Sequence, residues 1–233
     1  HVLDIGSGAG GDIDKYKKAN IRSLVGFDIV DVEYAYPKNI MEFYKVSGLY
    51  SISKTLQQKK PQFALPKKFD VVMCHFAMHY FFESTKTLDN FMSNVMENLK
   101  NNGYLVVTFM NGNDILTKLN GKSKVIEKHN KKMVYTITKK FEKVPKLVGN
   151  SLTVELSGTK YFNKEASNEY LVVPEMTIDY FEKKGLSLVE SKSFKDLCKS
   201  GTLFETCSML NPIEKDFSFM NMYQIYQYNS AKV

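Results

Sequence analysis

The feature that most constrains the fold of this 233-residue chain is a glycine-rich turn close to its start. A short apolar run, residues 2–5, leads into Gly6-Ser7-Gly8-Ala9-Gly10-Gly11, and a helix-like segment, residues 12–19, follows. Glycine permits a tight turn and lets the backbone approach a ligand at the carboxyl end of the first strand. The spacing of Gly6, Gly8 and Gly11 fits the GxGxxG pattern, which NAD-binding folds share. The turn therefore predicts a Rossmann-like domain that binds a nucleotide cofactor.

Strand-like and helix-like segments alternate over the first half of the chain. β-branched or aromatic runs lie at 2–5, 24–27, 71–73 and 104–109, and helix-like stretches lie at 12–19, after residue 30, and at 88–99. Further along we predict a helix at 176–184 and strands at 186–190 and 219–228. Such alternation predicts an α/β fold with a parallel sheet covered by helices on both faces.

Residues from about 120 to 168 interrupt this alternation. Period-two runs at 134–138 and 152–156 are separated by lysine-rich turns. They predict a small, mostly antiparallel insertion over the carboxyl edge of the sheet, on the substrate side. We expect one domain over residues 1–233 that contains this insertion. Because His1 directly precedes the first strand, we also expect further protein upstream.

Acidic residues around the glycine turn bear on the choice of cofactor. Asp28 ends the second strand, where an acid can accept hydrogen bonds from ribose hydroxyls in dinucleotide enzymes and in methyltransferases alike. Asp4 precedes the glycines and Asp12 follows them. Asp12 would repel a pyrophosphate but suits a cofactor that carries a sulfonium and an ammonium group. The pattern favours S-adenosylmethionine over NAD, with helix N-capping as an alternative role for Asp12.

The segment from Phe69 to Ser84 carries the most specific motif of the chain. An apolar strand is followed by His75-Phe76-Ala77-Met78-His79-Tyr80-Phe81-Phe82-Glu83-Ser84. The segment resembles the signature of cap guanine-N7 methyltransferases, with matches at Phe69, Asp70, Phe76, His79, Tyr80, Phe82, Glu83 and Ser84. The resemblance extends to the glycine turn with Lys15-Tyr16, to 169–172 and to 223–226, and residues 108–113 are similar to the viral members.

This resemblance implies a Rossmann-like S-adenosylmethionine methyltransferase fold with a mostly parallel, seven-stranded type of sheet. It implies transfer of a methyl group from S-adenosylmethionine to guanine-N7 of an RNA cap, in a domain of a longer capping enzyme from a large DNA virus. The positions that match the family's cofactor site are Gly6, Gly8, Asp12, Asp28, His75 and Phe76. Those that match the cap guanine pocket are His79, Tyr80, Glu169 and Tyr223.

The chain departs from the family at two of these motifs. Ala9 stands where cellular members often have a lysine, so a contact to the cap phosphates would come from elsewhere, with Lys15 and Lys18 as candidates. His75 stands where glutamine is usual. Core packing is the alternative role for Phe76 and Phe82, and it is the favoured role for Phe81. We expect one or two of the tyrosines at 223, 226 and 228 to be packing residues only.

Cysteines and histidines do not predict a metal site. The three cysteines, Cys74, Cys198 and Cys207, are odd in number and lack metal-ligand spacing, which favours a reduced intracellular compartment without disulfide or zinc. His75 and His79 have helical i, i+4 spacing, but a third ligand is missing, so we interpret them as pocket or surface residues.

The net charge of +7 favours a polyanionic partner, here capped RNA. The alternative is a solvated lysine surface, and the same two interpretations apply to the run Lys118, Lys122, Lys124, Lys128, Lys131 and Lys132. No run of ~18 apolar residues occurs, so no membrane span is expected; a viral protein of this kind would act in the host cytoplasm. The remaining alternatives are a methyltransferase of small molecules or proteins, and an inactive cofactor- or RNA-binding module.

Overall fold

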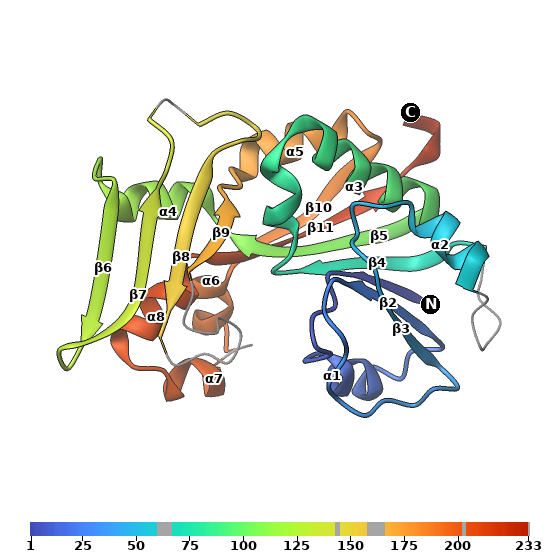
Figure 1. Cartoon of the computed structure of the whole chain (residues 1–233), viewed down its shortest axis with the longest axis horizontal. Helices are drawn as coiled ribbons and strands as arrows, with labels where there is room; N and C mark the ends of the chain where they lie inside the picture. Colours follow the sequence, from blue (N-terminus) through green and yellow to red (C-terminus); the bar gives the residue numbers. More distant parts are fainter. Residues whose placement is uncertain (60–66, 143–144, 158–165, 202–203, 233) are drawn as a thin grey trace.

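A seven-stranded sheet forms the centre of the computed structural model, which describes residues 1–59, 67–142, 145–157, 166–201 and 204–232 (Figure 1). Its strand order is β10-β11-β5-β4-β1-β2-β3. The strands are β1 (Val2–Ile5), β2 (Leu24–Asp28), β3 (Met41–Lys45), β4 (Phe69–His75), β5 (Leu99–Met110), β10 (Leu186–Ser193) and β11 (Asn221–Tyr228). β11 is antiparallel to both β10 and β5, and the other pairs of neighbouring strands are parallel. The predicted mostly parallel sheet is confirmed.

The order of the strands fixes where a ligand can bind. From β1 the chain moves outward through β2 and β3, and then crosses to the other side of β1 to form β4 and β5. In open α/β sheets, ligands bind at such a switch point, outside the carboxyl ends of the strands. Here that point is the crevice between the turn after β1 and the end of β4.

Helices cover both faces of this sheet. Figure 1 shows α3 (Thr85–Asn98) and α5 (Pro174–Glu182) on one side and α1 (Ile13–Lys18) on the other. The remaining helices are α2 (Ile52–Lys59), α4 (Gly112–Leu119), α6 (Phe194–Lys199), α7 (Phe204–Met209), α8 (Pro212–Phe219) and the 3-10 turns η1 (Met78–Glu83) and η2 (Ser230–Lys232). Ser84 caps α3 by accepting from the Thr87 amide, which fixes where η1 ends and α3 begins.

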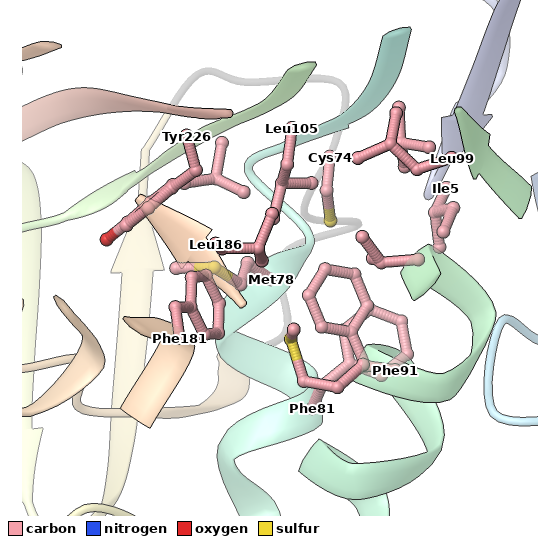
Figure 2. Close-up of a cluster of buried hydrophobic side chains, with 14 of the residues drawn as sticks. Ile5, Cys74, Met78, Phe81, Phe91, Leu99, Leu105, Phe181, Leu186 and Tyr226 are labelled. Carbon is pink, nitrogen blue, oxygen red and sulfur yellow. The ribbon is translucent and has the colours of Figure 1, made fainter. Parts of the chain in front are cut away.

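The main hydrophobic core lies between the sheet and the helices α3 and α5 on one of its faces, and Figure 2 shows part of it. Phe81 of η1 packs against Phe91 of α3 with ring centroids 4.7 Å apart, and Phe82 is fully buried. The predicted core role of Phe81 is therefore confirmed. Phe81 and Phe82 are buried in the core. They therefore fix η1 in place, and with it His79 and Tyr80, at the edge of the sheet where β4 ends.

A second, four-stranded antiparallel sheet follows α4 in the chain. Its strands are β6 (Lys124–His129), β7 (Lys132–Lys139), β8 (Ser151–Leu156) and β9 (Ser167–Tyr170), in that order. Tyr135, Ile137, Leu152 and Val154 form a separate buried cluster with residues of α4. The predicted antiparallel insertion is confirmed, with β6 and β9 added to the two strands that the sequence predicted.

The expected helix after Val30 is wrong. Between β2 and β3, residues 29–40 contain no helix, and the next helix, α2, comes only after β3. Pro37 lies inside this segment and cannot donate a helical backbone hydrogen bond. Val32, Tyr36 and Ile40 pack against the smaller core cluster that contains Ile13 without forming a helix.

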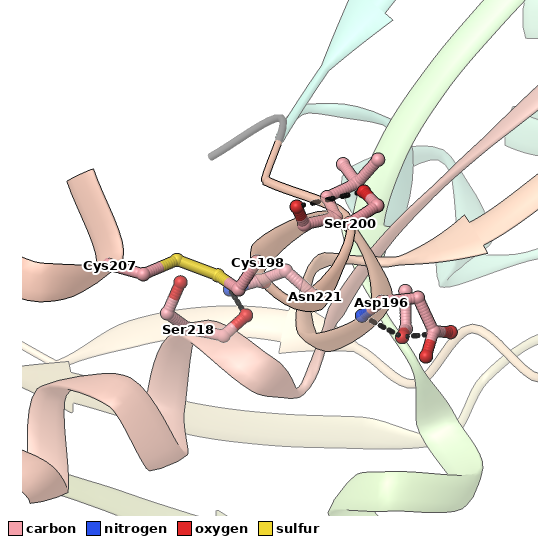
Figure 3. Close-up of a disulfide and its surroundings, with 8 residues drawn as sticks. Asp196, Cys198, Ser200, Cys207, Ser218 and Asn221 are labelled. Carbon is pink, nitrogen blue, oxygen red and sulfur yellow. Dashed lines mark hydrogen bonds between the residues drawn. A yellow bond between two sulfur atoms is a disulfide. The ribbon is translucent and has the colours of Figure 1, made fainter. Parts of the chain in front are cut away.

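The expectation of an unpaired set of cysteines is also wrong. Cys198 of α6 and Cys207 of α7 form a disulfide, with Cα atoms 6.2 Å apart, as Figure 3 shows. Cys74 is buried and free. Disulfide formation depends on how two Cβ atoms approach each other, and two helices packed together create that approach without any signature in the cysteine spacing.

In the described part of the chain, no helix has the length and apolarity needed to cross a membrane. Within the same residues, no group of three or more histidine, cysteine and acidic side chains is placed to hold a metal ion.

Candidate functional site

The turn after β1 has a conformation that requires glycine. Gly6, Gly8 and Gly10 have φ angles of 85°, 55° and 93°, in the left-handed region that side chains disfavour. A Cβ on Gly6 would overlap the Cβ of Ala77, just beyond β4. The turn therefore lies directly against the segment that carries the second motif.

Asp28 holds this turn in place. One carboxylate oxygen accepts a hydrogen bond from the amide of Gly8 at 2.7 Å, and the other accepts from the amide of Val30 at 3.0 Å. The side chain is half-buried and lines a cavity of about 170 Å³ with Ser7, Tyr44 and Lys45 among its neighbours. Each carboxylate oxygen can accept a further bond, so Asp28 can bind hydroxyls while it keeps the turn closed.

Two more carboxylates lie near the turn. Asp12 occupies the N-cap position of α1 without making a side-chain cap bond, and its carboxylate pairs instead with Lys15. Asp4 is buried, accepts from the hydroxyl of Tyr16 at 2.9 Å, and leaves its other oxygen without a partner. Burial raises the pKa of Asp4 to about 7. Asp12 is thus the N-cap residue of α1, as the alternative expected, but its side chain does not cap the helix. The unpartnered oxygen of Asp4 is a buried acceptor beside the turn.

The end of β4 brings the next two predicted residues to the same crevice. The Nδ1 atom of His75 lies 2.7 Å from the hydroxyl oxygen of Thr108 on β5. Burial lowers the pKa of His75, with Asp12 and Lys15 as its charged neighbours. Phe76 has a φ of 50° and is 48% exposed, and its ring meets Phe194 of α6 edge to face. His75 and Phe76 thus lie across the crevice from the glycine turn.

Three of the residues predicted to bind the cap come together at η1 and β9. His79 and Glu169 are buried, with Nε2 and Oε2 3.7 Å apart, and the rings of His79 and Tyr80 have centroids 4.2 Å apart. Both ring nitrogens of His79 and the Oε2 atom of Glu169 lack hydrogen-bond partners. Buried polar atoms are nearly always paired, so these mark a place where a ligand can supply the missing bonds.

The protonation of this pair follows from its burial. Burial lowers the pKa of His79 to about 3 and raises the pKa of Glu169 to about 7. The imidazole is therefore neutral at pH 7, and the pair is not a salt bridge despite its 3.7 Å separation. A carboxyl group that titrates near neutrality can gain its charge when a suitable donor binds.

The structure does not bring Tyr223 to these three residues. Its hydroxyl donates to Glu190 of β10 at 2.6 Å. In the register of the sheet, Tyr223 pairs with Thr108, which pairs with His75, so the three lie in one row across β11, β5 and β4. Tyr223 therefore belongs to the row that carries His75. Its predicted contact with the cap stays a prediction.

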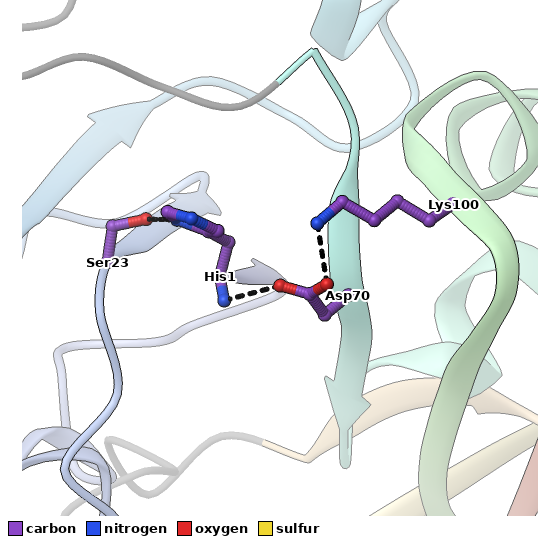
Figure 4. Close-up of polar contacts among 4 residues, drawn as sticks. All are labelled: His1, Ser23, Asp70 and Lys100. Atoms are coloured by element: carbon purple, nitrogen blue, oxygen red, sulfur yellow. Dashed lines mark hydrogen bonds and ion pairs between the residues drawn. The ribbon is translucent and has the colours of Figure 1, made fainter.

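Asp70, a matched residue of the second motif, lies at the other end of β4. Figure 4 shows its carboxylate between the amino group of His1 and Nζ of Lys100. The carboxylate oxygens lie 2.9 Å from the amino group and 2.6 Å from Nζ. These two hydrogen-bonded cations lower the pKa of Asp70. The residue ties β4 to β5 at the amino edge of the sheet, which is a structural role.

The predicted lysine run separates into two groups. Lys118 pairs with Glu127 at 2.7 Å and with Asp216 at 2.8 Å, which ties α4 to β6 and α8. The other lysines of the run are exposed around β6 and the β6–β7 turn: Lys122, Lys124, Lys128, Lys131 and Lys132. Only this second group is free to meet a phosphate backbone.

Sequence reasoning missed two residues that support the site. Thr108 fixes the ring of His75, and Ser167 lies 3.1 Å from the hydroxyl of Tyr80. Ser167 precedes Glu169 by two positions, so both side chains lie on the same face of β9. That spacing is the one signal in the sequence that points to Ser167.

Comparisons with known proteins agree with this arrangement. Residues 1–218 match the family described as mRNA (guanine-N(7))-methyltransferase domain. A probable mRNA-capping enzyme of Acanthamoeba polyphaga mimivirus is 31% identical over 84% of this chain and 20% of its own length. An mRNA cap guanine-N(7) methyltransferase of Drosophila melanogaster is 28% identical over 85% of this chain and 48% of its own length.

The chain thus spans between a fifth and about half of these two relatives. Among solved structures, a putative S-adenosylmethionine-dependent methyltransferase from Listeria monocytogenes has a TM-score of 0.58 at 15% identity, covering 98% of this chain and 91% of its own. One from Mesorhizobium loti has the same TM-score at 11% identity, with 97% and 90% covered. These two show the fold. The match over residues 1–218 shows that the chain belongs to the mRNA (guanine-N(7))-methyltransferase domain family.

Proposed function

We propose that this chain transfers the methyl group of S-adenosylmethionine to guanine-N7 of an RNA 5′ cap. The observation that carries the proposal is the buried pair of His79 and Glu169 beside the half-exposed ring of Tyr80, with polar atoms that lack partners. Guanine presents two adjacent donors, the N1 hydrogen and the exocyclic amine. A carboxylate can accept both, and an aromatic ring can stack on the base.

The crevice beside the glycine turn fits the cofactor. Asp28 can accept further hydrogen bonds from ribose hydroxyls. The unpartnered oxygen of Asp4, beside the glycine turn, favours the ammonium group of the cofactor. Gly6, Gly8 and Asp12 from the turn, with His75 and Phe76 from the end of β4, complete the proposed cofactor site. When bound, the cofactor supplies a methyl group already activated by its sulfonium.

In the proposed reaction, the residues of this chain orient the guanine and stabilise the charge that develops on it. Guanine-N7 has a lone pair and no proton to remove, so no general base is needed, and we assign no catalytic acid or base. Holding the base in line with the methyl group lowers the entropic barrier. Positive charge develops on the guanine ring during transfer, and the carboxylate of Glu169 stabilises it.

Methyl transfer to a guanosine-capped transcript tests the proposal directly. We expect transfer to capped RNA and none to the same RNA with a 5′ triphosphate. Binding of the cofactor with transfer to a small molecule or a protein instead would favour a different methyltransferase. Binding of RNA or cofactor without any transfer would favour an inactive binding module.

Replacing Asp28 by alanine should weaken cofactor binding. Hydrogen bonds to a charged acceptor contribute about 1.5–3 kcal/mol, so affinity for S-adenosylmethionine should fall about ten- to hundredfold. Calorimetry measures the affinity, with Asp179→Ala as a control because its carboxylate pairs with Lys183 on the exposed surface of α5, outside the cavity that Asp28 lines. Unchanged affinity in a folded Asp28→Ala protein would remove Asp28 from the cofactor site.

The exposed lysines around β6 should make RNA affinity depend on salt. Each phosphate neutralised releases a counterion, so log affinity should fall linearly with log salt, with a slope of about −0.7 per contact on single strands. Gln substitutions at Lys128, Lys131 and Lys132 should reduce the slope by about 2. The same substitutions at Lys54 and Lys59 of α2, at the opposite end of the molecule in Figure 1, serve as the control. If the β6 variant and the α2 variant show the same slope of log affinity against log salt, the lysines around β6 do not contact RNA and only form a solvated surface.

We further propose that the chain acts together with other capping domains. The viral relative is about five times longer than the part of it that this chain matches. If this chain is also viral, its place of action is the host cytoplasm, and capped RNA is its partner.

A further inference from the structure

Ser167 connects two residues of the proposed cap site that come from distant parts of the chain. Its hydroxyl oxygen lies 3.1 Å from the hydroxyl of Tyr80 on η1, a separation of 87 positions in the sequence. Ser167 also lies two positions before Glu169 on the same face of β9, where its hydroxyl can donate to the carboxyl group, an interaction that lowers the pKa of Glu169. The Oε2 atom of Glu169 stays without a partner and is oriented toward His79.

The donor and acceptor properties of these groups fix the direction of the two bonds. An ionised carboxylate can only accept, so the single proton of Ser167 must go to Glu169. The oxygen of Ser167 must then accept the proton of Tyr80. When Glu169 is ionised, the order is therefore Tyr80 to Ser167 to Glu169, and each hydroxyl has one defined orientation.

We propose that Ser167 is a positioning residue for guanine recognition, which orients the Tyr80 hydroxyl and holds Glu169 as an acceptor for the base. This inference rests on the proposed function. Without Ser167, the Tyr80 hydroxyl loses its acceptor and Glu169 loses the interaction that lowers its pKa, although the residues that would touch the guanine are unchanged.

The surroundings of Glu169 make this role visible in a titration. The groups facing it from η1 are His79, which burial keeps neutral, and Tyr80, while β8 places the apolar Leu152 opposite. The hydrogen bond from Ser167 is the interaction that holds the pKa of Glu169 down, against the larger effect of burial that raises it. Loss of the Ser167 hydroxyl should therefore move the titration of Glu169 to higher pH.

The experiment measures binding of 7-methylguanosine triphosphate by calorimetry between pH 5.5 and 9 and follows Glu169 by carbon NMR of the ligand-free protein. For the wild type we expect affinity to fall about tenfold per pH unit below pH 7, as Glu169 becomes protonated. Ser167→Ala should shift both midpoints upward by about one pH unit, because a hydrogen bond to a charged group is lost. Ser167→Thr, which keeps the hydroxyl, should restore the wild-type midpoints.

Two controls separate this role from others. Ser230→Ala removes a hydroxyl that lies 3.1 Å from Asn101, near the amino end of β5, and should leave both midpoints unchanged. In a Glu169→Gln background, Ser167→Ala should cause no pH-dependent change. Wild-type midpoints in a folded Ser167→Ala protein would overturn the inference alone. A wild type that neither binds the cap analogue nor methylates capped RNA would overturn the proposed function, and the inference with it.

Discussion

Replacing Glu169 by alanine should reduce methyl transfer to capped RNA by ~10²-fold or more in kcat/KM. Glu169 is buried between η1 and β8, and its Oε2 atom lacks a partner. In this position the carboxylate can accept from the guanine edge, and its attraction for the ring grows as positive charge develops there. Affinity for S-adenosylmethionine should be unchanged, because the residues proposed to bind the cofactor, Asp28 and the glycine turn, are not altered.

Steady-state kinetics with guanosine-capped and adenosine-capped transcripts provide the measurement. Adenine presents an acceptor at its ring position, so the wild type should prefer guanosine and Glu169→Ala should lose most of that preference. Glu97→Ala is the matched control, because Glu97 lies exposed on α3. A Glu169→Ala enzyme that keeps the wild-type rate, or the wild-type preference for guanosine, would exclude Glu169 from base recognition.

Local sequence patterns predicted the parts of the fold that depend on local interactions. The turn at Gly6 and Gly8 requires left-handed backbone, and glycine alone tolerates it without strain. The helix ending before Leu99 shows an apolar stripe that fits one face of the sheet. The expectation of a helix after Val30 transferred the usual alternation of α/β folds to a segment that Pro37 interrupts, whose apolar residues pack against the core without a helix.

Local sequence patterns could not predict contacts between segments that are distant in the sequence. Ser167 and Tyr80 meet because β9 of the insertion packs against η1, and nothing in either segment encodes that packing. The disulfide between Cys198 and Cys207 depends in the same way on how α6 meets α7. Tyr223 shares its row with His75, although the resemblance grouped it with His79 and Tyr80. Family motifs supplied the candidate residues, and the packing of β9 against η1 brings three of them, His79, Tyr80 and Glu169, together.

The second large effect concerns stability, and it has the opposite sign to the effect on activity. Burial raises the pKa of Glu169 from 4.5 in the unfolded chain to about 7 in the folded one. Between these values the folded state binds more protons than the unfolded state, so stability falls as pH rises. The fall ends above pH 7, where both states are ionised. A shift of this size corresponds to roughly 3 kcal/mol at pH 8.

Glu169→Gln should therefore stabilise the ligand-free protein above pH 7 while it abolishes most of the methyl transfer. Glutamine keeps the shape of the side chain, carries no charge to desolvate, and can donate through its amide to the neutral ring of His79. At pH 8 we expect a gain of up to roughly 3 kcal/mol in the free energy of unfolding, or about 6 to 12 °C in Tm for a domain of this size, and at pH 4.5 no gain.

Thermal melts of both proteins from pH 4.5 to 8.5 measure the difference in stability. The similar contribution of Asp4 cancels in this difference, because both proteins retain Asp4. A difference that does not grow with pH would mean that Glu169 is ionised at little cost in the folded protein. A growing difference, together with loss of transfer, would show that the free energy spent on keeping a carboxylate in this buried position is recovered only when the guanine binds.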